Sequence, residues 1–352
     1  MNIHEKYIKR CIELAQNGLG NTYPNPLVGS VIVHNDLIIG EGWHRKAGEA
    51  HAEVNAINSV SNKKLLKEAT IYVSLEPCSH FGKTPPCSDL IIANGIRKVV
   101  IGTMDPFAKV AGRGIKKLMD AGCKVKVGIL EEECLELNKR FFIFHKKQRP
   151  YIILKWTQTQ DGFIAPEKRD EKRPVWITNK YSGQLVHKWR SEEPGILVGT
   201  KTVLDDNPSL NVRKWTGNNP VRIIIDSQLK TPEDFSVLNG KQKTIVLCNE
   251  LPENSKQENL IFEKIEFSGN ICKQICEVLY KHEIQSVIVE GGKHTLQQFI
   301  DSSLWDEARV FTGNSEFKNG LKAPEISGKL TSKKDIAGDT LKIYKNDQDH
   351  NI

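Results

Sequence analysis

The feature that most constrains the fold is a regular alternation of strand and helix patterns along the first 147 residues. Short β-branched runs such as "ATIYVSLE" and "RKVVIGT" alternate with segments of helical spacing such as "HAEVNAINSV" and "GIKKLMDAG". Asn35-Asp36, between "VGSVIVH" and "LIIGEGW", predicts a hairpin turn. The acidic start and basic end of residues 131–147 fit one long helix. Together these patterns predict an α/β domain of three layers.

The alternation is interrupted near "HKKQRP" and resumes with "YIILKWTQTQDG". Further strand patterns follow at "GILVGT", "VRIIID", "KTIVLC" and "QSVIVEGG", with helical stretches between them. A chain of 352 residues is long for a single core. We therefore predict two domains, residues 1–147 and 148–352, both of the α/β class.

Composition narrows the class of protein. No apolar run approaches the roughly 18–20 residues that a membrane span requires, and the N-terminus is typical of an amphipathic helix rather than a signal peptide. We expect a cytoplasmic protein that does not bind a membrane. The net charge is +7, and residues 1–147 carry 21 Lys and Arg against 15 Asp and Glu. This balance suits a phosphorylated metabolite or nucleic acid, although solvated surface lysines would produce it too.

Two cysteines, Cys78 and Cys87, each follow a proline in "SLEPCSHFGKTPPCSDL". A disulfide, a metal site and a pair of core cysteines are all compatible with this stretch taken alone. A reducing compartment disfavours the disulfide. Upstream, "GEAHAEVNAI" places His51 and Glu53 two residues apart at a predicted helix start. One imidazole and two thiolates provide three tetrahedral positions for zinc and leave the fourth for water, whose pKa zinc lowers to about 7.

The conjunction of His51, Cys78 and Cys87 therefore predicts a zinc centre, with Glu53 as the group that moves protons rather than as a ligand. A different pair, Cys272 and Cys276, lies one helical turn apart without a matching ligand and predicts core packing.

The spacing between the thiols separates classes of deaminase. Nucleobase deaminases generally use P-C-x-x-C, whereas eight residues separate Cys78 from Cys87. The intervening loop should place His80 and Lys83 at the rim of the pocket. Lys83 could contact a substrate phosphate there, or it could simply face solvent.

These motifs resemble one known family, the bifunctional deaminase–reductases of riboflavin biosynthesis. "TYPNPLVGSVIV", "GEGWHRKAGEAHAEVNAI", "LEPCSHFGKTPPC" and "DPFAKVAGRGIKKLMDAG" are similar to its deaminase half. The resemblance implies a cytidine-deaminase-like fold with His51, Cys78 and Cys87 as zinc ligands and Glu53 as proton shuttle. It also implies that Asn25 binds the pyrimidine, although "PNP" alone could be only a rigid turn.

The second half contains no G-x-G-x-x-G fingerprint. It contains "SVIVEGGKHTL", a strand, two glycines and a helix start, which can hold a phosphate but is also a common turn. "LKWTQTQDGFIA" and "HKWRSEEPGILVGTKTVLDDNPSLNVR" resemble the reductase half of the same family, which has a dihydrofolate-reductase-like fold.

The resemblance implies specific contacts in this domain. For NADPH these are Thr157, Trp176, Thr202, Asp206, Ser227, Gly291 and Gly292. For the substrate they are Arg190, Leu210, Arg213 and Glu290. Two arginines suit a ribose phosphate, but Arg190 could also pair with its neighbours Glu192 and Glu193. Asp161 is predicted to be a turn residue, and no residue is identified as the proton donor.

The resulting hypothesis is an enzyme that deaminates a phosphorylated pyrimidine with zinc and then reduces its ribosyl side chain with NADPH. A homo-oligomer is expected. One alternative is a nucleic-acid base deaminase with an accessory domain. Another is a non-catalytic protein stabilised by zinc, which His80 as a fourth ligand would support.

Overall fold

The computed structural model describes residues 2–79, 85–106, 112–168, 175–253 and 257–347. The chain divides into two compact units after Lys147. His80 and Lys83 lie outside the described residues. Within the described part of the chain, no helix is long and apolar enough to cross a membrane.

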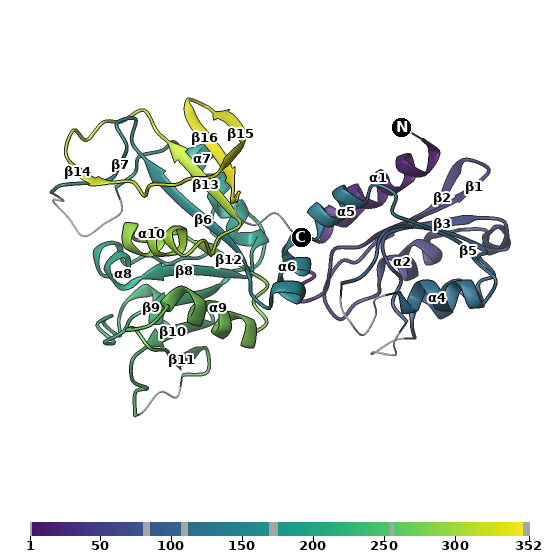
Figure 1. Ribbon diagram of the computed structural model, residues 1–352, viewed down its shortest axis with the longest axis horizontal. Coiled ribbons are helices and arrows are strands. Elements are labelled where there is room, and N and C mark those ends of the chain that lie inside the picture. Colours follow the sequence, from purple (N-terminus) through teal and green to yellow (C-terminus); the bar gives the residue numbers. More distant parts are fainter. Residues whose placement is uncertain (1, 80–84, 107–111, 169–174, 254–256, 348–352) are drawn as a thin grey trace. The chain divides into compact units, whose positions relative to one another are not determined.

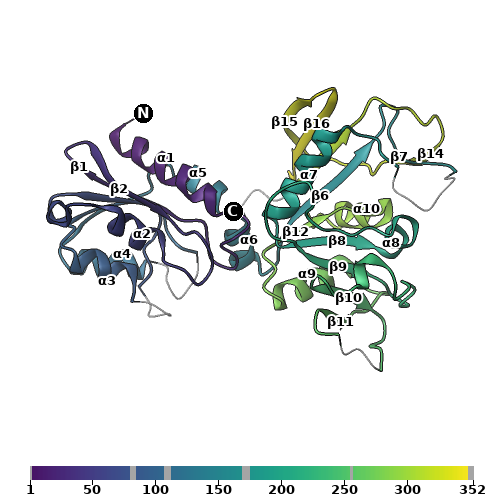
Figure 2. The same cartoon turned by 180° about the vertical axis from the view of Figure 1, so that it is seen from behind.

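The first unit is a sheet covered by helices on both faces (Figures 1 and 2). Its strands, in spatial order, are β2 (Leu37–Trp43), β1 (Gly29–His34), β3 (Thr70–Leu75), β4 (Lys98–Thr103) and β5 (Lys124–Val127). The hairpin β1–β2 is antiparallel, and β3, β4 and β5 run parallel. The predicted turn is confirmed, because Asn35 and Asp36 both adopt positive φ angles of 48° and 59°.

Two layers of helices enclose this sheet. On one face lie α1 (Ile3–Ala15) and α5 (Glu131–Leu137), whose side chains join those of β1, β3 and β4 in one core cluster. On the other lie α2 (Ala52–Ser59), α3 (Cys87–Ala93) and α4 (Arg113–Asp120). The predicted three-layer α/β arrangement is therefore confirmed.

The prediction of one long helix over residues 131–147 is wrong. The segment forms α5 and then α6 (Lys139–Lys147), with Asn138 between them at φ −105° and ψ 19°. Asn138 is buried, and its side chain binds the backbone of Leu27, far away in the sequence. A tertiary contact therefore accompanies the break in the helix.

The second unit is built on a larger sheet with helices on both faces (Figures 1 and 2). Its central and parallel strands, in spatial order, are β11 (Leu260–Lys264), β10 (Thr244–Cys248), β9 (Val221–Ile225), β8 (Gly195–Gly199), β12 (Ser286–Val289), β6 (Tyr151–Gln158) and β13 (Glu307–Thr312). Antiparallel strands β16 (Asp339–Lys345) and β15 (Lys329–Ile336) complete the edge next to β13. A small separate ladder joins β7 (Phe163–Pro166) to β14 (Gly320–Lys322).

The helices of this unit also form two layers. Side chains of α9 (Ile271–Lys281) and α10 (Lys293–Asp301) pack on one face, where Cys272 and Cys276 are buried in the core as predicted. On the other face lies α8 (Thr200–Asp206), together with α7 (Lys180–Glu192), whose Trp189 packs against Phe311.

The connections from β8 and β12 diverge. After β8 the chain forms α8 and adds β9 on one side, whereas after β12 it forms α10 and continues to β13 on the other side. Strand ends at such a switch point in a parallel sheet line a crevice in which ligands bind.

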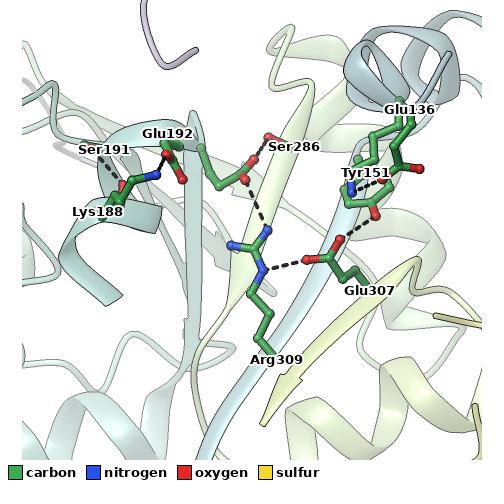
Figure 3. A network of polar contacts seen from close by, with 10 residues as sticks. Glu136, Tyr151, Lys188, Ser191, Glu192, Ser286, Glu307 and Arg309 are labelled. Atoms are coloured by element: carbon green, nitrogen blue, oxygen red, sulfur yellow. Dashed lines mark hydrogen bonds and ion pairs between the residues drawn. The ribbon is translucent and has the colours of Figure 1, made fainter. Parts of the chain in front are cut away.

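Polar contacts hold α7 against this sheet. Arg309 donates to Glu307 over 2.6 Å, and Glu307 also accepts a hydrogen bond of 3.0 Å from the Tyr151 hydroxyl (Figure 3). The guanidinium of Arg309 lies 4.6 Å from the ring centre of Trp189 on α7. This network joins β6, β13 and the helix that carries Arg190.

The C-terminal hairpin of β15 and β16 anchors the start of α7. No role for this segment was identified from the sequence. The Asp339 carboxylate accepts from the Asn179 backbone N–H over 2.8 Å and from the Ser182 hydroxyl over 2.6 Å. In return, the Asn179 side-chain amide donates to the Ile336 carbonyl over 2.7 Å. Asp339 is buried, so these bonds replace water for both partners.

Candidate active sites

His51, Cys78 and Cys87 converge in the first unit. His51 is the N-cap of α2, Cys78 follows the end of β3, and Cys87 is the first residue of α3. Their ligand atoms all lie within 4.8 Å of one another. The His51 Nδ1 is 3.4 Å from the Cys87 Sγ and 3.6 Å from the Cys78 Sγ. The Cys thiols are free rather than joined in a disulfide.

The surroundings of Cys78 favour its thiolate form. The Cys87 backbone N–H donates to the Cys78 Sγ over 3.2 Å. Hydrogen bonding from the Cys87 thiol, with further help from His51, lowers the pKa of Cys78. One imidazole and two sulfurs form a donor set that fits zinc and leaves one tetrahedral position open.

Glu53 lies in the first turn of α2, two residues after His51, and is only 3% exposed. Burial, together with negative charge on Cys78, raises the pKa of Glu53 to about 7. A carboxyl group with such a pKa can both give and take a proton near neutral pH.

A pair of polar side chains approaches the same cluster from the β1 and β2 side. The Asn25 Nδ2 lies 3.1 Å from the His44 Nε2, and the His44 Nδ1 lies 3.2 Å from the Ala50 carbonyl oxygen. The rings of His44 and His51 are 5.4 Å apart. The sequence interpretation assigned Asn25 but overlooked His44, a second histidine in the same "GWHRKAGEAHAE" stretch.

Arg190 and Glu290 form the centre of the second site. Glu290 directly follows β12, and its carboxylate accepts two hydrogen bonds from Arg190, at 3.0 Å and 2.6 Å. The alternative pairing of Arg190 with Glu192 or Glu193 is not observed, because Glu192 pairs with Lys188 and Glu193 accepts from Ser286.

Lys155 of β6 completes this ionic group, with its Nζ 3.9 Å from the Glu290 carboxylate. Burial alone would raise the pKa of Glu290, but Arg190 and Lys155 outweigh it and lower that pKa to about 2. Burial lowers the pKa of Lys155. The sequence interpretation missed Lys155, although a lysine inside the apolar run "YIILKW" is an unusual choice for a central strand.

Arg213 and His187 lie near Arg190. The Arg213 backbone N–H donates to the His187 Nδ1 over 3.2 Å. Burial, with the charges of Arg190 and Arg213, lowers the pKa of His187 to about 4. Leu210 is buried and adopts a positive φ of 50°, which is unusual for a branched residue. The neutral His187 thus supports the backbone of an arginine that carries a positive charge.

The glycine turn lies at the switch point between β8 and β12. Gly292 has a φ of 66° and is the N-cap of α10, with no side-chain cap for the helix N–H groups. A Cβ on Gly291 would lie 2.9 Å from Val198 and 3.0 Å from the Thr202 Oγ1. Gly291 therefore has no room for a side chain against β8 and α8, and the N–H groups at the start of α10, which lack a side-chain cap, are of the kind that can bind a phosphate. Thr295, also near Gly292, was not identified from the sequence.

The remaining predicted cofactor residues are more scattered. Thr157 lies near the end of β6, Ser227 follows β9, and Asp206 ends α8. Trp176 is 67% exposed, with the Lys214 ammonium 5.2 Å from its ring centre. Asp161 is a turn residue as predicted, since it accepts hydrogen bonds from Thr159 and from the backbone of Phe317 and Lys318.

Comparison with known proteins gives two family matches that lie one after the other along the chain. Residues 1–103 match the cytidine and deoxycytidylate deaminase zinc-binding region, and residues 150–314 match the RibD C-terminal domain. The riboflavin biosynthesis protein RibD of Aquifex aeolicus is 42% identical over 97% of this chain and 98% of its own length. RibD of Escherichia coli is 36% identical over 87% of this chain and 86% of its own.

Solved structures agree with the sequence relatives. The crystal structure of a diaminohydroxyphosphoribosylaminopyrimidine deaminase/5-amino-6-(5-phosphoribosylamino)uracil reductase from Thermotoga maritima is 37% identical, with a TM-score of 0.88, and the match covers 98% of this chain and 99% of that one. RibD of Acinetobacter baumannii is 30% identical, with a TM-score of 0.87, over 97% and 98% of the two chains. The resemblance inferred from the motifs is confirmed, and the chain belongs to the RibD family of bifunctional deaminase–reductases of riboflavin biosynthesis.

Proposed function

We propose that the chain deaminates 2,5-diamino-6-(5-phosphoribosylamino)pyrimidin-4-one and then reduces the product to 5-amino-6-(5-phosphoribitylamino)uracil. The observation that carries this proposal is the convergence of His51, Cys78 and Cys87 beside the buried Glu53, in a chain whose other unit has the reductase fold. We further propose that it is a cytoplasmic homo-oligomer, and that nucleic acid is not a substrate.

In the deaminase unit, His51, Cys78 and Cys87 are the proposed zinc ligands. Zinc held there supplies a water of lowered pKa. The Glu53 carboxyl carries protons to the pyrimidine ring nitrogen and to the departing amine, which leaves as ammonia. A pKa of about 7 suits a group that both accepts and donates a proton. Asn25 holds the pyrimidine, and Lys83 is the proposed contact for its phosphate.

In the reductase unit, the substrate lies against Arg190, Leu210, Arg213 and Glu290. Three positive side chains, those of Lys155, Arg190 and Arg213, outnumber the one carboxylate of Glu290, and this balance favours a substrate that carries a phosphate. The proposed contacts for NADPH are Thr157, Trp176, Thr202, Asp206, Ser227, Gly291 and Gly292.

Hydride from NADPH reduces the ribosyl C1′, and the reaction also consumes one proton. Lys155 is the proposed donor of that proton. It is the buried cation next to Glu290, and its lowered pKa makes the ammonium a stronger acid than a solvated lysine.

The proposal predicts two separable changes in product mass. Purified protein incubated with the diaminopyrimidine ribotide should convert an amine to a carbonyl without NADPH and add two hydrogens only when NADPH is supplied. Mass spectrometry of the two reactions measures both. An unchanged ribotide, with zinc confirmed in the protein, would contradict the proposal.

The metal assignment predicts a defined zinc content. Elemental analysis should find about one zinc per chain, as expected for a single site with three protein ligands. Cys87→Ser should lower this content because a hydroxyl is a poor zinc ligand, whereas Cys123→Ser, at a buried cysteine outside the cluster, should retain it. Equal zinc content in the two variants would place the metal elsewhere.

A further inference from the structure

Asn138, at the break between α5 and α6, makes a paired contact with one distant residue. The Leu27 N–H donates to the Asn138 Oδ1 over 2.8 Å, and the Asn138 Nδ2 donates to the Leu27 carbonyl oxygen over 2.8 Å. Asn138 is 2% exposed and Leu27 is 7% exposed. One side-chain amide thus satisfies both backbone groups of Leu27, as a neighbouring strand would.

The segment that contains Leu27 has few backbone N–H donors. Pro24 and Pro26 have no backbone N–H to donate. Asn25 donates its backbone N–H to the Thr22 carbonyl over 2.7 Å, a bond within the same turn. Residues 24–27 therefore have two backbone N–H groups. That of Asn25 bonds within the turn, and that of Leu27 bonds to Asn138, between α5 and α6.

A short path of contacts leads from this segment to the proposed zinc ligands. The Asn25 amide meets the His44 Nε2 at 3.1 Å, and the His44 Nδ1 meets the Ala50 carbonyl at 3.2 Å. Ala50 directly precedes His51. The His44 backbone N–H also donates to the Val28 carbonyl over 2.9 Å, so His44 contacts one residue on each side of Leu27, Asn25 and Val28.

We propose that Asn138 is a positioning residue for deamination. It holds residues 24–27 in place, so that the Asn25 side chain is positioned to bind the pyrimidine. The inference rests on the proposed function, because it takes Asn25 as a pyrimidine contact. Asn138 acts through Leu27, two residues from Asn25, and the contact that it makes is with the backbone rather than with the reacting atoms.

The chemistry of the contact explains why an asparagine stands here. An amide provides one acceptor and one donor in a single plane, which matches the N–H and C=O of Leu27. An aspartate would place a second acceptor against the Leu27 carbonyl oxygen. An alanine would leave both buried backbone groups without their partner.

The test compares Asn138→Asp and Asn138→Gln with the parent chain. We expect Asn138→Asp to raise the KM for the diaminopyrimidine ribotide by about tenfold, the scale expected when a buried hydrogen-bond pair is lost, while kcat changes less. Asn138→Gln keeps both the donor and the acceptor of the side-chain amide, so its KM should rise less than that of Asn138→Asp. Zinc content and the NADPH-dependent reduction of the deaminated intermediate, supplied directly, should stay at the parent values.

A core variant separates positioning from general destabilisation. Val99→Ala removes buried apolar contacts in β4 and should lower the thermal stability of the unit without a selective rise in KM. If Asn138→Asp and Val99→Ala alter KM equally, or if Asn138→Asp loses zinc rather than substrate affinity, the positioning role is wrong. If the parent chain itself does not deaminate the ribotide, the proposed function fails instead, so the two failures are distinguishable.

Discussion

Replacement of Glu53 by glutamine should lower the rate of deamination by about 10²–10⁴-fold, the range over which positioned acid–base groups contribute. Glutamine has nearly the same size as glutamate and can keep its place in the first turn of α2, but its amide acts neither as an acid nor as a base near pH 7. The carboxyl of Glu53 is buried with a pKa of about 7, so its proton is available where the reaction needs it. Steady-state release of ammonia measures the effect.

The control for this variant is Glu49→Gln. Glu49 lies two residues before His51 but is exposed, so loss of its charge should leave the rate near that of the parent chain. Zinc content should be unchanged in both variants, since neither residue is a proposed ligand. A Glu53→Gln variant that retains zinc and deaminates at the parent rate would show that another group carries the proton.

The proposed zinc ligands could be predicted from the sequence because each lies beside a local signal in the sequence. His51 and Glu53 stand at a recognisable helix start, and Cys78 and Cys87 lie beside a strand end and a helix start. Secondary structure of this kind follows from apolar periodicity and end signals, and the packing of α2 and α3 in one core with β3 brings the three atoms together. The roles of Asn25 and of the cofactor residues came from the resemblance rather than from the pattern.

The break at Asn138 shows what local pattern omits. Residues 131–147 have an acidic start, a basic end and apolar spacing that all favour one continuous helix. The structure has two helices, and the residue between them bonds to a backbone 111 positions away. Helical periodicity is judged over a short stretch of sequence, and such a stretch does not contain a partner that is 111 positions away.

Arg190 and Glu290 were both named from the resemblance, but their pairing with each other and with Lys155 was missed for a related reason. Proximity in the sequence suggested Glu192 and Glu193 as partners for Arg190. The observed partner, Glu290, is 100 residues away and becomes a neighbour only because β12 lies beside β8 and β6 in the sheet. Lys155, on β6, joins the group through the same strand order. Sheet topology, rather than helix or strand propensity, decides which charges meet.

Replacement of Lys155 by methionine should lower the rate of the NADPH-dependent reduction by about 10²–10⁴-fold if Lys155 donates the proton. Methionine fills a similar apolar volume in β6, but it removes the acid and leaves Glu290 with Arg190 as its remaining cationic partner in this group. The deaminase activity of the same chain, in the other unit, should be unchanged. Absorbance of NADPH follows the reduction, and ammonia release follows deamination.

The pH dependence distinguishes an acid from a fixed charge at this position. An acid must be protonated, so the parent rate of reduction should be high below the pKa of Lys155 and should fall as the pH rises through it. Burial lowers that pKa, so the decline in rate should occur at a lower pH than for a solvated lysine.

Lys155→Arg keeps the charge but holds its proton too tightly to donate it, so its rate should stay low and lack this decline. Lys188→Met, at a more exposed lysine of α7, is the matched control and should behave as the parent. A Lys155→Arg variant with the parent rate and profile would instead assign Lys155 a purely electrostatic role.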